Sequence, residues 1–504
     1  MGIIEGFVSG FLQAVSLEVL PYLLVGSVFG LLIGVIPGLG GHFAMAMIIP
    51  FLYGMEPAAG IAFLLGAHST VAQGGGLTAI LFSTPGTGQN AATMLDGPPM
   101  RNMGLGAMAA GAALTACFLG AAFGAFTLAA LLPILQKIVL FFGPPEIFVL
   151  AFLALTFVAV LGRGELVRGL IAALLGLLMA MIGLDNVTNT ERFTMGVIDL
   201  RDGLELVPVI LGLFAVAEVF DLWIKGGSLS GEGTALLSAR ETQVQILRGV
   251  METFRRWWLV LRCSAIGVAM GLIPGLGSAP AAFVAYGHAK QTSKSPETFG
   301  KGSIEGVIAP EASNDAVEGG ALASTVAFGI PGSSSMAIVL SALFILGQET
   351  GPAMINDHVD VVFVMIFTII IGNLIGMVGG ILLVNPLSRA TGVRSGILVP
   401  VLITIVFTGA YAVQLSWFDI SVTFLFGIIG FAMKELGYSR ASMLIGFVLG
   451  FAVEKNLYLA MQLEGPYFIF QPIPLTLALI TVVFLAYNVW EAIRHHRRQK
   501  KHAS

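Results

Sequence analysis

The sequence predicts an all-α polytopic membrane protein, and two features of its composition carry that prediction. Only 11% of the 504 residues are charged and 56% are hydrophobic, whereas soluble domains carry about 25% charged residues. The long runs without Asp, Glu, Lys or Arg are Val19–Met55, Pro57–Leu95, Asn102–Gln136, Gly319–Gln348, Val361–Ser388 and Gly465–Trp490. A spanning helix needs roughly 20 mainly apolar residues, so we expect about ten to twelve transmembrane helices.

The basic residues are concentrated in two places, which orients the chain. The tail Arg494–His502 follows the last apolar run directly, and the long polar stretch Lys225–Arg262 contains five arginines. Short basic flanks stay on the cytoplasmic side, so we place both segments in the cytoplasm. The expected organisation is a first transmembrane half (1–224), a polar cytoplasmic linker (225–256), a second transmembrane half (257–491) and a basic cytoplasmic tail (492–504).

The two halves resemble each other. The stretch Gly34–Gly41 recurs as Gly271–Ser278, and Ser83–Thr87 is matched by Gly329–Ser333. The offsets are 237 and 246 residues, and an extra loop such as Gln291–Lys301 accounts for the difference. Each half therefore contains two Pro-Gly motifs in the same order. This pattern predicts two repeats, for which we favour an inverted over a parallel topology, and internal repeats are typical of transporters.

Each Pro-Gly motif inside an apolar run predicts a discontinuous or re-entrant helix. Proline lacks the amide donor and glycine loosens the backbone. Where a helix restarts, its free amides and its dipole favour an anion such as a carboxylate. The alternative is a kink or a tight crossing of small residues, and the duplication favours a binding site. The predicted substrate-binding residues are Pro37, Gly38, Gly40, Gly41, Thr84, Pro85, Gly86, Thr87, Asn90, Pro274, Gly275, Gly277, Ser278, Asn314, Pro331, Gly332, Ser333 and Ser334.

Three acidic residues near these motifs are candidates for holding a coupling ion: Asp96, Glu311 and Asp315. Carboxylate and amide oxygens suit a sodium ion, and a carboxylate alone can carry a proton. The other interpretation is a solvated loop in which Ser313, Asn314 or Asp315 caps a helix that begins near Val317. The sequence leaves both interpretations open. We expect no firm metal site and no cofactor besides a coupling Na⁺ or H⁺.

Other polar residues have simpler interpretations. His42 and His68 could relay protons, but a neutral histidine satisfied by a neighbouring helix is favoured. Arg101 is interpreted as an anchor at a helix end rather than a partner of a substrate carboxylate. Cys117 and Cys263 are expected to be buried thiols. The chain has no Gly-x-Ser-x-Gly, Walker, His-Glu-x-x-His or paired Cys-x-x-Cys motif, so we expect no enzyme activity.

At these motifs the chain resembles the large membrane subunit of the tripartite tricarboxylate transporter family of bacteria. The matching stretches are Gly34–Gly41, Ile80–Thr87, Leu95–Gly97, Phe299–Val307, Pro310–Asn314, Gly329–Ser333 and Gly351–Pro352. The resemblance implies a multi-pass protein of the bacterial inner membrane. It also implies two partners, which are a small four-helix membrane subunit and a periplasmic solute-binding protein.

The resemblance further implies secondary transport of a carboxylate, driven by Na⁺ or H⁺, through an elevator-like movement. The chain departs from the family at Asp315, where a second Asn is usual, and at Gly88-Gln89 after the Pro-Gly-Thr motif. Both departures lie at the predicted substrate site, so the resemblance implies a carboxylate without implying citrate. A passive anion channel, an intramembrane enzyme and a structural scaffold are the alternatives, and the channel is the strongest of them.

Overall fold

The computed structural model describes residues 2–36, 39–161, 166–185, 189–225, 239–273, 277–389 and 395–502. Across these residues the chain is helical apart from turns and one short antiparallel pair of strands, β1 (Gly183–Leu184) and β2 (Glu191–Arg192). This confirms the all-α prediction. The chain divides into two compact units. Unit 1 comprises 1–136 and 207–431, and unit 2 comprises 137–206 and 432–504.

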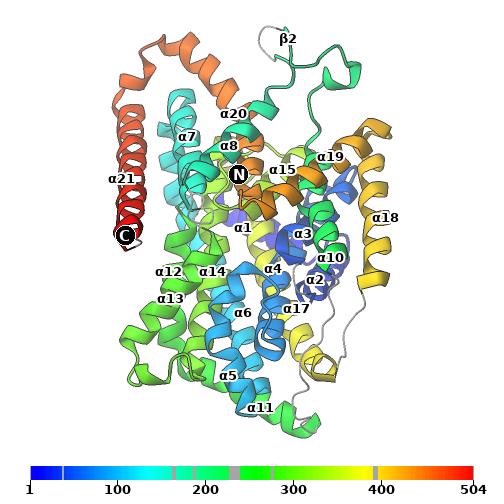
Figure 1. Cartoon of the computed structure of the whole chain (residues 1–504), viewed down its shortest axis with the longest axis vertical. Helices are drawn as coiled ribbons and strands as arrows, with labels where there is room; N and C mark the ends of the chain where they lie inside the picture. The colour runs from blue at the N-terminus through cyan, green and yellow to red at the C-terminus, as the bar shows by residue number, and fades with distance from the viewer. Residues whose placement is uncertain are drawn as a thin grey trace. The chain divides into compact units, whose positions relative to one another are not determined.

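Unit 1 contains most of the helices (Figure 1). They are α1 (Ile3–Ala14), α2 (Leu20–Gly34), α3 (Gly40–Ile48), α4 (Pro57–Phe82), α5 (Gly97–Asn102), α6 (Gly106–Ile138), α9 (Leu206–Ile210), α10 (Ala217–Lys225), α11 (Ala239–Arg255), α12 (Trp257–Gly271), α13 (Ser278–Thr292), α14 (Ile304–Phe328), α15 (Ser334–Ile345), α16 (Pro352–Asn356), α17 (Val359–Arg389), α18 (Ser395–Gln414) and α19 (Trp417–Glu435). Two 3₁₀ turns, η2 (Gly88–Ala91) and η3 (Thr93–Leu95), follow α4, and a π-helix, η6 (Leu211–Val216), joins α9 to α10.

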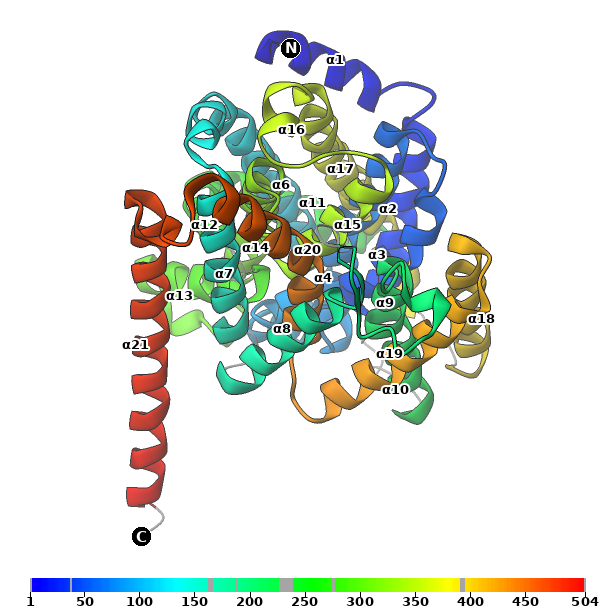
Figure 2. The ribbon, with the colours of Figure 1, turned by 90° about the horizontal axis from the view of Figure 1, so that it is seen from above.

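Unit 2 contains α7 (Pro144–Leu161), α8 (Leu166–Ala180), α20 (Arg440–Glu464) and α21 (Pro472–His502). The strand pair is tied to α20, because Arg192 donates to both carboxylate oxygens of Glu454 at 2.5 and 3.0 Å. Figure 2 shows α21 as one long helix with the C-terminus at its end. Only 6% of its apolar window is buried within the chain, so few residues of this apolar helix are covered by the rest of unit 2.

Six helical segments in the described part of the chain are long and apolar enough to cross a membrane: Gly106–Phe141, Leu206–Ile224, Val359–Leu387, Trp417–Glu435, Arg440–Glu464 and Pro472–Trp490. This establishes a multi-pass protein but is fewer than the ten to twelve spans predicted. The physical reason is that several apolar runs are interrupted, so they form shorter helices such as α2 and α12 with 15 residues each.

Two helix pairs in unit 1 pack in the same way. Gly30 and Gly34 of α2 lie against the backbones of Ala67 and Val71 in α4, and Gly267 and Gly271 of α12 lie against Ser313 and Val317 in α14. The α2 glycines are offset from the α12 glycines by 237 residues, and their partners in α4 from those in α14 by 246. These are the offsets of the Pro-Gly motifs. Small residues let helix backbones approach closely, and each pair is therefore a tight crossing of two parallel helices.

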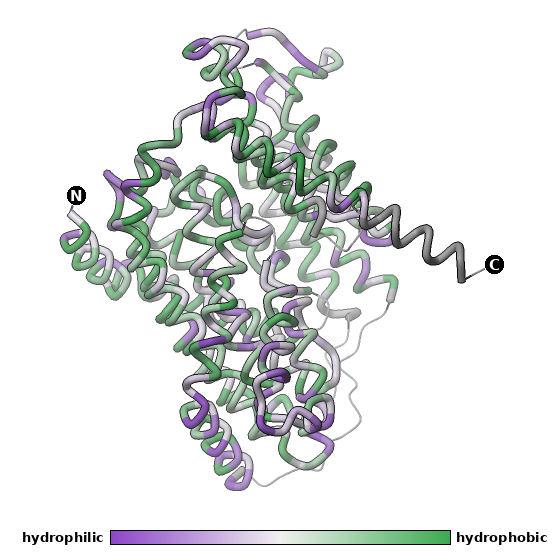
Figure 3. The backbone as a smooth tube through the Cα atoms, turned by 90° about the vertical axis from the view of Figure 1, so that its left-hand side faces the viewer, coloured by the Kyte–Doolittle hydropathy of each residue, from purple (hydrophilic) through white to green (hydrophobic). Residues whose placement is uncertain are grey.

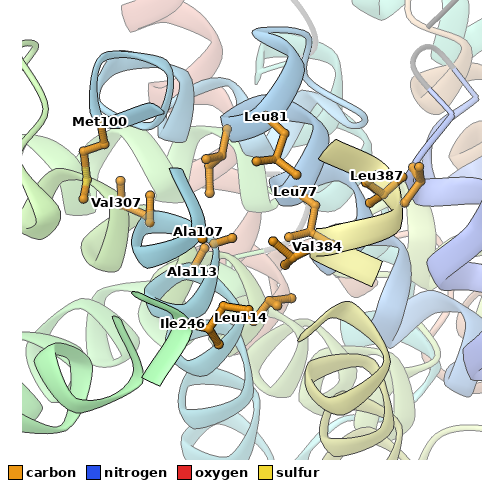
Figure 4. Packing of buried hydrophobic residues seen from close by; sticks show 14 residues of the cluster. Leu77, Leu81, Met100, Ala107, Ala113, Leu114, Ile246, Val307, Val384 and Leu387 are labelled. Atoms are coloured by element: carbon orange, nitrogen blue, oxygen red, sulfur yellow. The ribbon is translucent and has the colours of Figure 1, made fainter. Parts of the chain in front are cut away.

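The matched helices α4 and α14 run in opposite directions where they meet. His68 of α4 pairs with Glu318 of α14, whereas Gly76, two turns later in α4, lies beside Glu311, two turns earlier in α14. Around them, apolar side chains from four helices form a core. Figure 4 shows Leu77, Leu114 and Val384 approaching one another from α4, α6 and α17, with Ile246 of α11 beside Leu114.

A glycine substitution tests the close packing of α12 against α14. We expect Gly271→Ala to destabilise the protein by roughly 1–3 kcal/mol, because the new methyl group would collide with the Val317 carbonyl oxygen. Gly287→Ala is the matched control, because Gly287 lies in α13 with open space beside it. The midpoint of thermal unfolding in detergent should fall for the first variant and not for the second. Equal midpoints would contradict the close packing.

Candidate functional site

The second and fourth Pro-Gly motifs interrupt the chain in the same way. Helix α4 ends at Phe82 and is followed by Ser83 in the left-handed region (φ 54°), and α14 ends at Phe328 and is followed by Gly329 (φ 66°). In each case the glycine after the proline folds back onto its own helix. Gly86 lies against Gly75 and Thr78, and Gly332 lies against Ala321 and Ser324. The discontinuous helices predicted at these motifs are confirmed.

The first and third motifs precede the restart of a helix. Pro37, Gly38, Pro274 and Gly275 lie outside the described residues. After them, Gly40 (φ 65°) begins α3 and Gly277 (φ 67°) immediately precedes α13. Both positions need the left-handed backbone that glycine adopts readily. Neither glycine has another atom within 4 Å of the place where a Cβ would lie, so the two helix starts face open space.

The four motifs come together in unit 1. The Gly34 carbonyl lies against Gly86, which joins the first motif to the second. His42 Nε2 and Ser334 Oγ are 2.6 Å apart, which joins the start of α3 to the fourth motif. Ser278 donates to Gln89 Oε1, which joins the start of α13 to the second motif. Sequence reasoning had placed Ser278 and Ser334 at the site but had not anticipated Gln89 or His42 as their partners.

Glu311 is the centre of the polar contacts behind the second motif. It is fully buried and accepts hydrogen bonds from Asn90 Nδ2 at 3.2 and 3.3 Å, from Cys117 Sγ at 3.1 Å and from Thr93. Thr87 orients Asn90 by donating to its Oδ1 at 2.5 Å. These contacts attach the loop after α4 to the middle of α14. Cys117 and Thr93 were not predicted, because a lone cysteine or threonine in an apolar run carries no signal of its own.

Asn314 and Asp315 are buried beside Glu311 with incomplete hydrogen bonding. Asn314 is 1% exposed, and neither its oxygen nor its nitrogen makes a well-aligned hydrogen bond to a described residue. Asp315 is 4% exposed, and its Oδ2 is likewise without a donor. The interpretation in which these residues cap a helix near Val317 does not hold, because α14 runs unbroken from Ile304 to Phe328. An unsatisfied buried amide costs about 1–3 kcal/mol, so this amide is suited to a ligand.

His68 has a charged partner. Its Nε2 lies 2.9 Å from Glu318 Oε2, and the two side chains are 7% and 12% exposed. The histidine thus faces a carboxylate on a neighbouring helix, but neither of its ring nitrogens makes a well-aligned hydrogen bond to a described residue. Sequence reasoning missed Glu318. The available signal was its position three residues after Asp315, which places both carboxylates on one face of α14.

Asp96 is held by backbone donors. Its Oδ1 accepts from the amides of Gly300, Gly302 and Ser303 at 2.8–2.9 Å, and its Oδ2 accepts from the Tyr286 hydroxyl at 2.9 Å. This arrangement fastens the loop that precedes α14. Arg101, on the next helix, donates to the Leu81 carbonyl at 2.8 Å and so anchors the end of α4. These contacts support structural roles, and the prediction of a coupling-ion role for Asp96 stays untested.

Comparison with known proteins identifies the family. The family described as the tripartite tricarboxylate transporter TctA family matches residues 20–445. The chain belongs to this family. A protein of Agrobacterium vitis described as an uncharacterized 52.8 kDa protein in the TAR-I ttuC' 3' region is 31% identical over 487 residues, which cover 96% of this chain and 95% of that protein.

A second protein of Agrobacterium vitis, described as an uncharacterized protein in the TAR-II ttuC' 3' region, is 29% identical over 236 residues. The match covers 46% of this chain and 98% of that protein. No solved structure matches the chain. Membership of the TctA family makes the chain a membrane subunit of a tripartite tricarboxylate transporter, which works with partner subunits and a binding protein.

Two substitutions separate the possible roles of Asp96. We expect Asp96→Ala to lose folded protein, because three amides lose their acceptor at roughly 1–3 kcal/mol each. Asp96→Asn keeps an acceptor oxygen, and we expect it to retain both folding and ion-driven uptake. The folded fraction by size-exclusion chromatography and uptake into proteoliposomes are the measurements. A folded Asp96→Asn variant that exchanges substrate but cannot concentrate it would instead establish Asp96 as a coupling residue.

Proposed function

We propose that this chain is the translocating subunit of a secondary active importer of a carboxylate in the bacterial inner membrane. A periplasmic solute-binding protein delivers the anion, and a small four-helix membrane subunit completes the complex. The observation that carries the proposal is the meeting of the four Pro-Gly motifs in unit 1, with the buried Asn314 beside Glu311 behind the second motif. Transporter sites of this kind lie between discontinuous helices near the middle of the membrane.

Backbone amides at the N-terminal ends of helices would bind the substrate. Amides at the beginning of α3, α13 and α15 offer donors, and the helix dipoles favour negative charge there. Ser333 caps α15 by accepting from the Met336 amide at 3.2 Å, which leaves its own hydroxyl proton for a ligand. The Asn314 amide can donate to a carboxylate without repelling it. A carboxylate substrate would thus replace hydrogen bonds that the interrupted backbone lacks.

A coupling cation, Na⁺ or H⁺, would offset the charge of the anion. Glu311 and Asp315 are the carboxylates placed to attract it, since both lie in the middle of α14. The antiparallel meeting of α4 and α14 supports inverted repeats, which provide two equivalent arrangements open to opposite sides. We propose that an elevator-like movement interconverts them. All described residues of the site belong to unit 1.

Replacing Asn314 separates binding from stability. We expect Asn314→Leu to lower uptake about tenfold or more while leaving stability equal or higher, because it removes an amide that is unsatisfied in the protein. Asn373→Leu is the matched control. Asn373 is also buried, but it accepts from Gln73 at 2.9 Å, so its loss should lower stability.

The measurements for this pair are thermal unfolding in detergent and uptake of labelled mono-, di- and tricarboxylates into proteoliposomes with both partner proteins. Normal uptake by Asn314→Leu would remove Asn314 from the site. The same assay tests the passive channel, because a channel only equilibrates its solute, whereas concentrative uptake under an imposed ion gradient requires coupling.

The charges on two amphipathic helices orient the chain. Helix α11 exposes an apolar stripe of Leu247, Met251 and Phe254 and contains the basic residues Arg240, Arg248 and Arg255. In α1 the single charged residue is the acidic Glu5. Figure 3 shows α11 as a largely hydrophilic helix at the lower end of the molecule, well below the N-terminus. By the positive-inside rule we propose that α11 and the C-terminal tail are cytoplasmic and that α1 is periplasmic.

Single cysteines test this orientation. We expect Glu5→Cys to react with a membrane-impermeant maleimide in intact spheroplasts, and Arg248→Cys to react only in inside-out vesicles. Both side chains are exposed, and the native cysteines are buried, so the unmodified chain is the background control. The reverse labelling pattern would invert the proposed topology.

A further inference from the structure

The middle of α14 contains three buried acidic side chains, and not all of their oxygens receive a hydrogen bond. Glu311, Asp315 and Glu318 are spaced i, i+4 and i+7, so they lie on one face of the helix. They are 0%, 4% and 9% exposed. Glu311 has donors on both oxygens, but Asp315 Oδ2 has none. The basic side chain that joins this face is His68, at 2.9 Å from Glu318.

We propose that the His68–Glu318 pair is a proton-binding site, and that the proton bound there is the cation carried with the anionic substrate. This inference rests on the proposed transport function and names its coupling ion and its residues. The pair shares one proton between an imidazole nitrogen and a carboxylate oxygen. With that proton it is neutral overall. Without it, Glu318 carries an uncompensated charge.

The nature of the partner favours a proton over sodium. Hard cations are bound by several oxygen ligands, whereas here a nitrogen faces the carboxylate at hydrogen-bonding distance. Histidine is also the side chain that exchanges protons near neutral pH. Neither ring nitrogen of His68 makes a well-aligned hydrogen bond to a described residue, so the contact with Glu318 at 2.9 Å is the one polar contact that the described residues offer the ring.

The surrounding charges link the proton to the anion. Asp315 lies within electrostatic range of both Glu311 and Glu318. Buried like charges repel strongly, so a second negative charge from the substrate enters this region more readily when the pair holds its proton. By thermodynamic linkage, substrate binding then strengthens proton binding by the same factor. Proton and anion are therefore bound and released together.

The His68–Glu318 pair lies on the two helices that lead into the substrate site, so its protonation state can affect that site. His68 belongs to α4, which leads into the Ser83–Thr87 motif, and Glu318 belongs to α14, which leads into the Gly329–Ser333 motif. The two helices are the matched members of the two halves and meet in antiparallel fashion. Loss of the proton removes the attraction between them at this point, which gives the bound proton a direct effect on both motifs.

Other titratable groups near α4 and α14 have partners outside the pair, apart from Cys117 and from His288 on α13, whose Nε2 is buried without a partner among the described residues. That thiol, on α6, donates to Glu311 and lies beside Asp315. The groups with such partners include Glu305 with Arg256, Glu56 with the Ala59 amide, His42 with Ser334, Tyr286 with Asp96, Arg101 with Leu81, Cys263 beside Ala285, Tyr22 against Phe63 and Asp360 with Gln13. A pH response of this region is therefore assigned to the His68–Glu318 pair together with Asp315 and Glu311.

Two uptake assays test the proposal with the complete chain and both partner proteins in proteoliposomes. Labelled citrate, succinate and benzoate are the probes. Exchange of labelled for unlabelled probe at equal pH measures transport without net coupling. Accumulation under an inward proton gradient, with no sodium present, measures coupling. The variants are His68→Gln and Glu318→Gln, and Cys263→Ser, a buried thiol on α12 outside the pair, is the control.

We expect wild type and Cys263→Ser to accumulate a probe roughly tenfold or more under the proton gradient. Both pair variants should exchange the same probe at a comparable rate but reach only equal concentrations inside and outside. Proton-driven accumulation by either variant, or accumulation by wild type under a sodium gradient alone, would overturn the proton site while leaving carboxylate transport intact. Absence of exchange by wild type would instead refute the proposed function, and this inference with it.

A misfolded variant is distinguished by the same experiment. Misfolding abolishes exchange and accumulation together, so the pair is then tested by Glu318→Asp, which retains a shorter carboxylate. We expect this variant to exchange and to accumulate, with a shifted dependence on external pH. An unchanged pH profile in a variant that exchanges normally would count against the pair as the proton site.

Discussion

The constraint on which the rest of the structure depends is that an interrupted helix inside a membrane must satisfy the backbone groups it frees. Lipid offers no hydrogen bonds, so these groups need partners from protein, water or ligand. In unit 1 the second and fourth Pro-Gly motifs fold their glycines back onto the preceding helix, so that Gly86 packs onto α4 and Gly332 onto α14. The remaining donors at the starts of α3, α13 and α15 are left for a ligand. The interruption that costs stability thereby creates the site.

Close packing makes this possible. The glycines of α2 and α12 bring their helices against the backbones of α4 and α14, and so α4 and α14 form the fixed centre of unit 1. Their meeting places three carboxylates, an asparagine and a histidine in a region without bulk water. Polar groups in such a region are expensive unless they are paired or serve a function. Glu311 has donors on both oxygens, whereas Asn314 makes no well-aligned hydrogen bond and Asp315 Oδ2 has no donor among the described residues. We assign the substrate to Asn314 and the coupling proton to the His68–Glu318 pair on the same helices.

Much of the fold followed from the sequence. Low charge and long apolar runs established a helical membrane protein, because hydrocarbon admits few other structures. The Pro-Gly motifs located the interruptions, since proline and glycine act on the backbone wherever they stand. Interrupted runs such as those around Gly34 and Gly271 yield helices of 15 residues, shorter than an uninterrupted span. Helix α14 ends at its Pro-Gly motif, but the sequence left its course before Val317 open, because Ser313, Asn314 and Asp315 also suit a helix cap.

The sequence by itself determined which segments lie in the membrane, where the helices break and which family the motifs resemble, because these properties depend on local composition and spacing. Only the tertiary structure decided which breaks meet, and that Glu318 pairs with His68 while Glu311 pairs with Asn90 and Cys117. It also decided that Asp96 fastens a loop. These residues are separated by some 190 to 250 positions, and no local pattern encodes such a distance. The contacts arise from the antiparallel crossing of two helices, whose partners are chosen by packing and not by the residues that flank them.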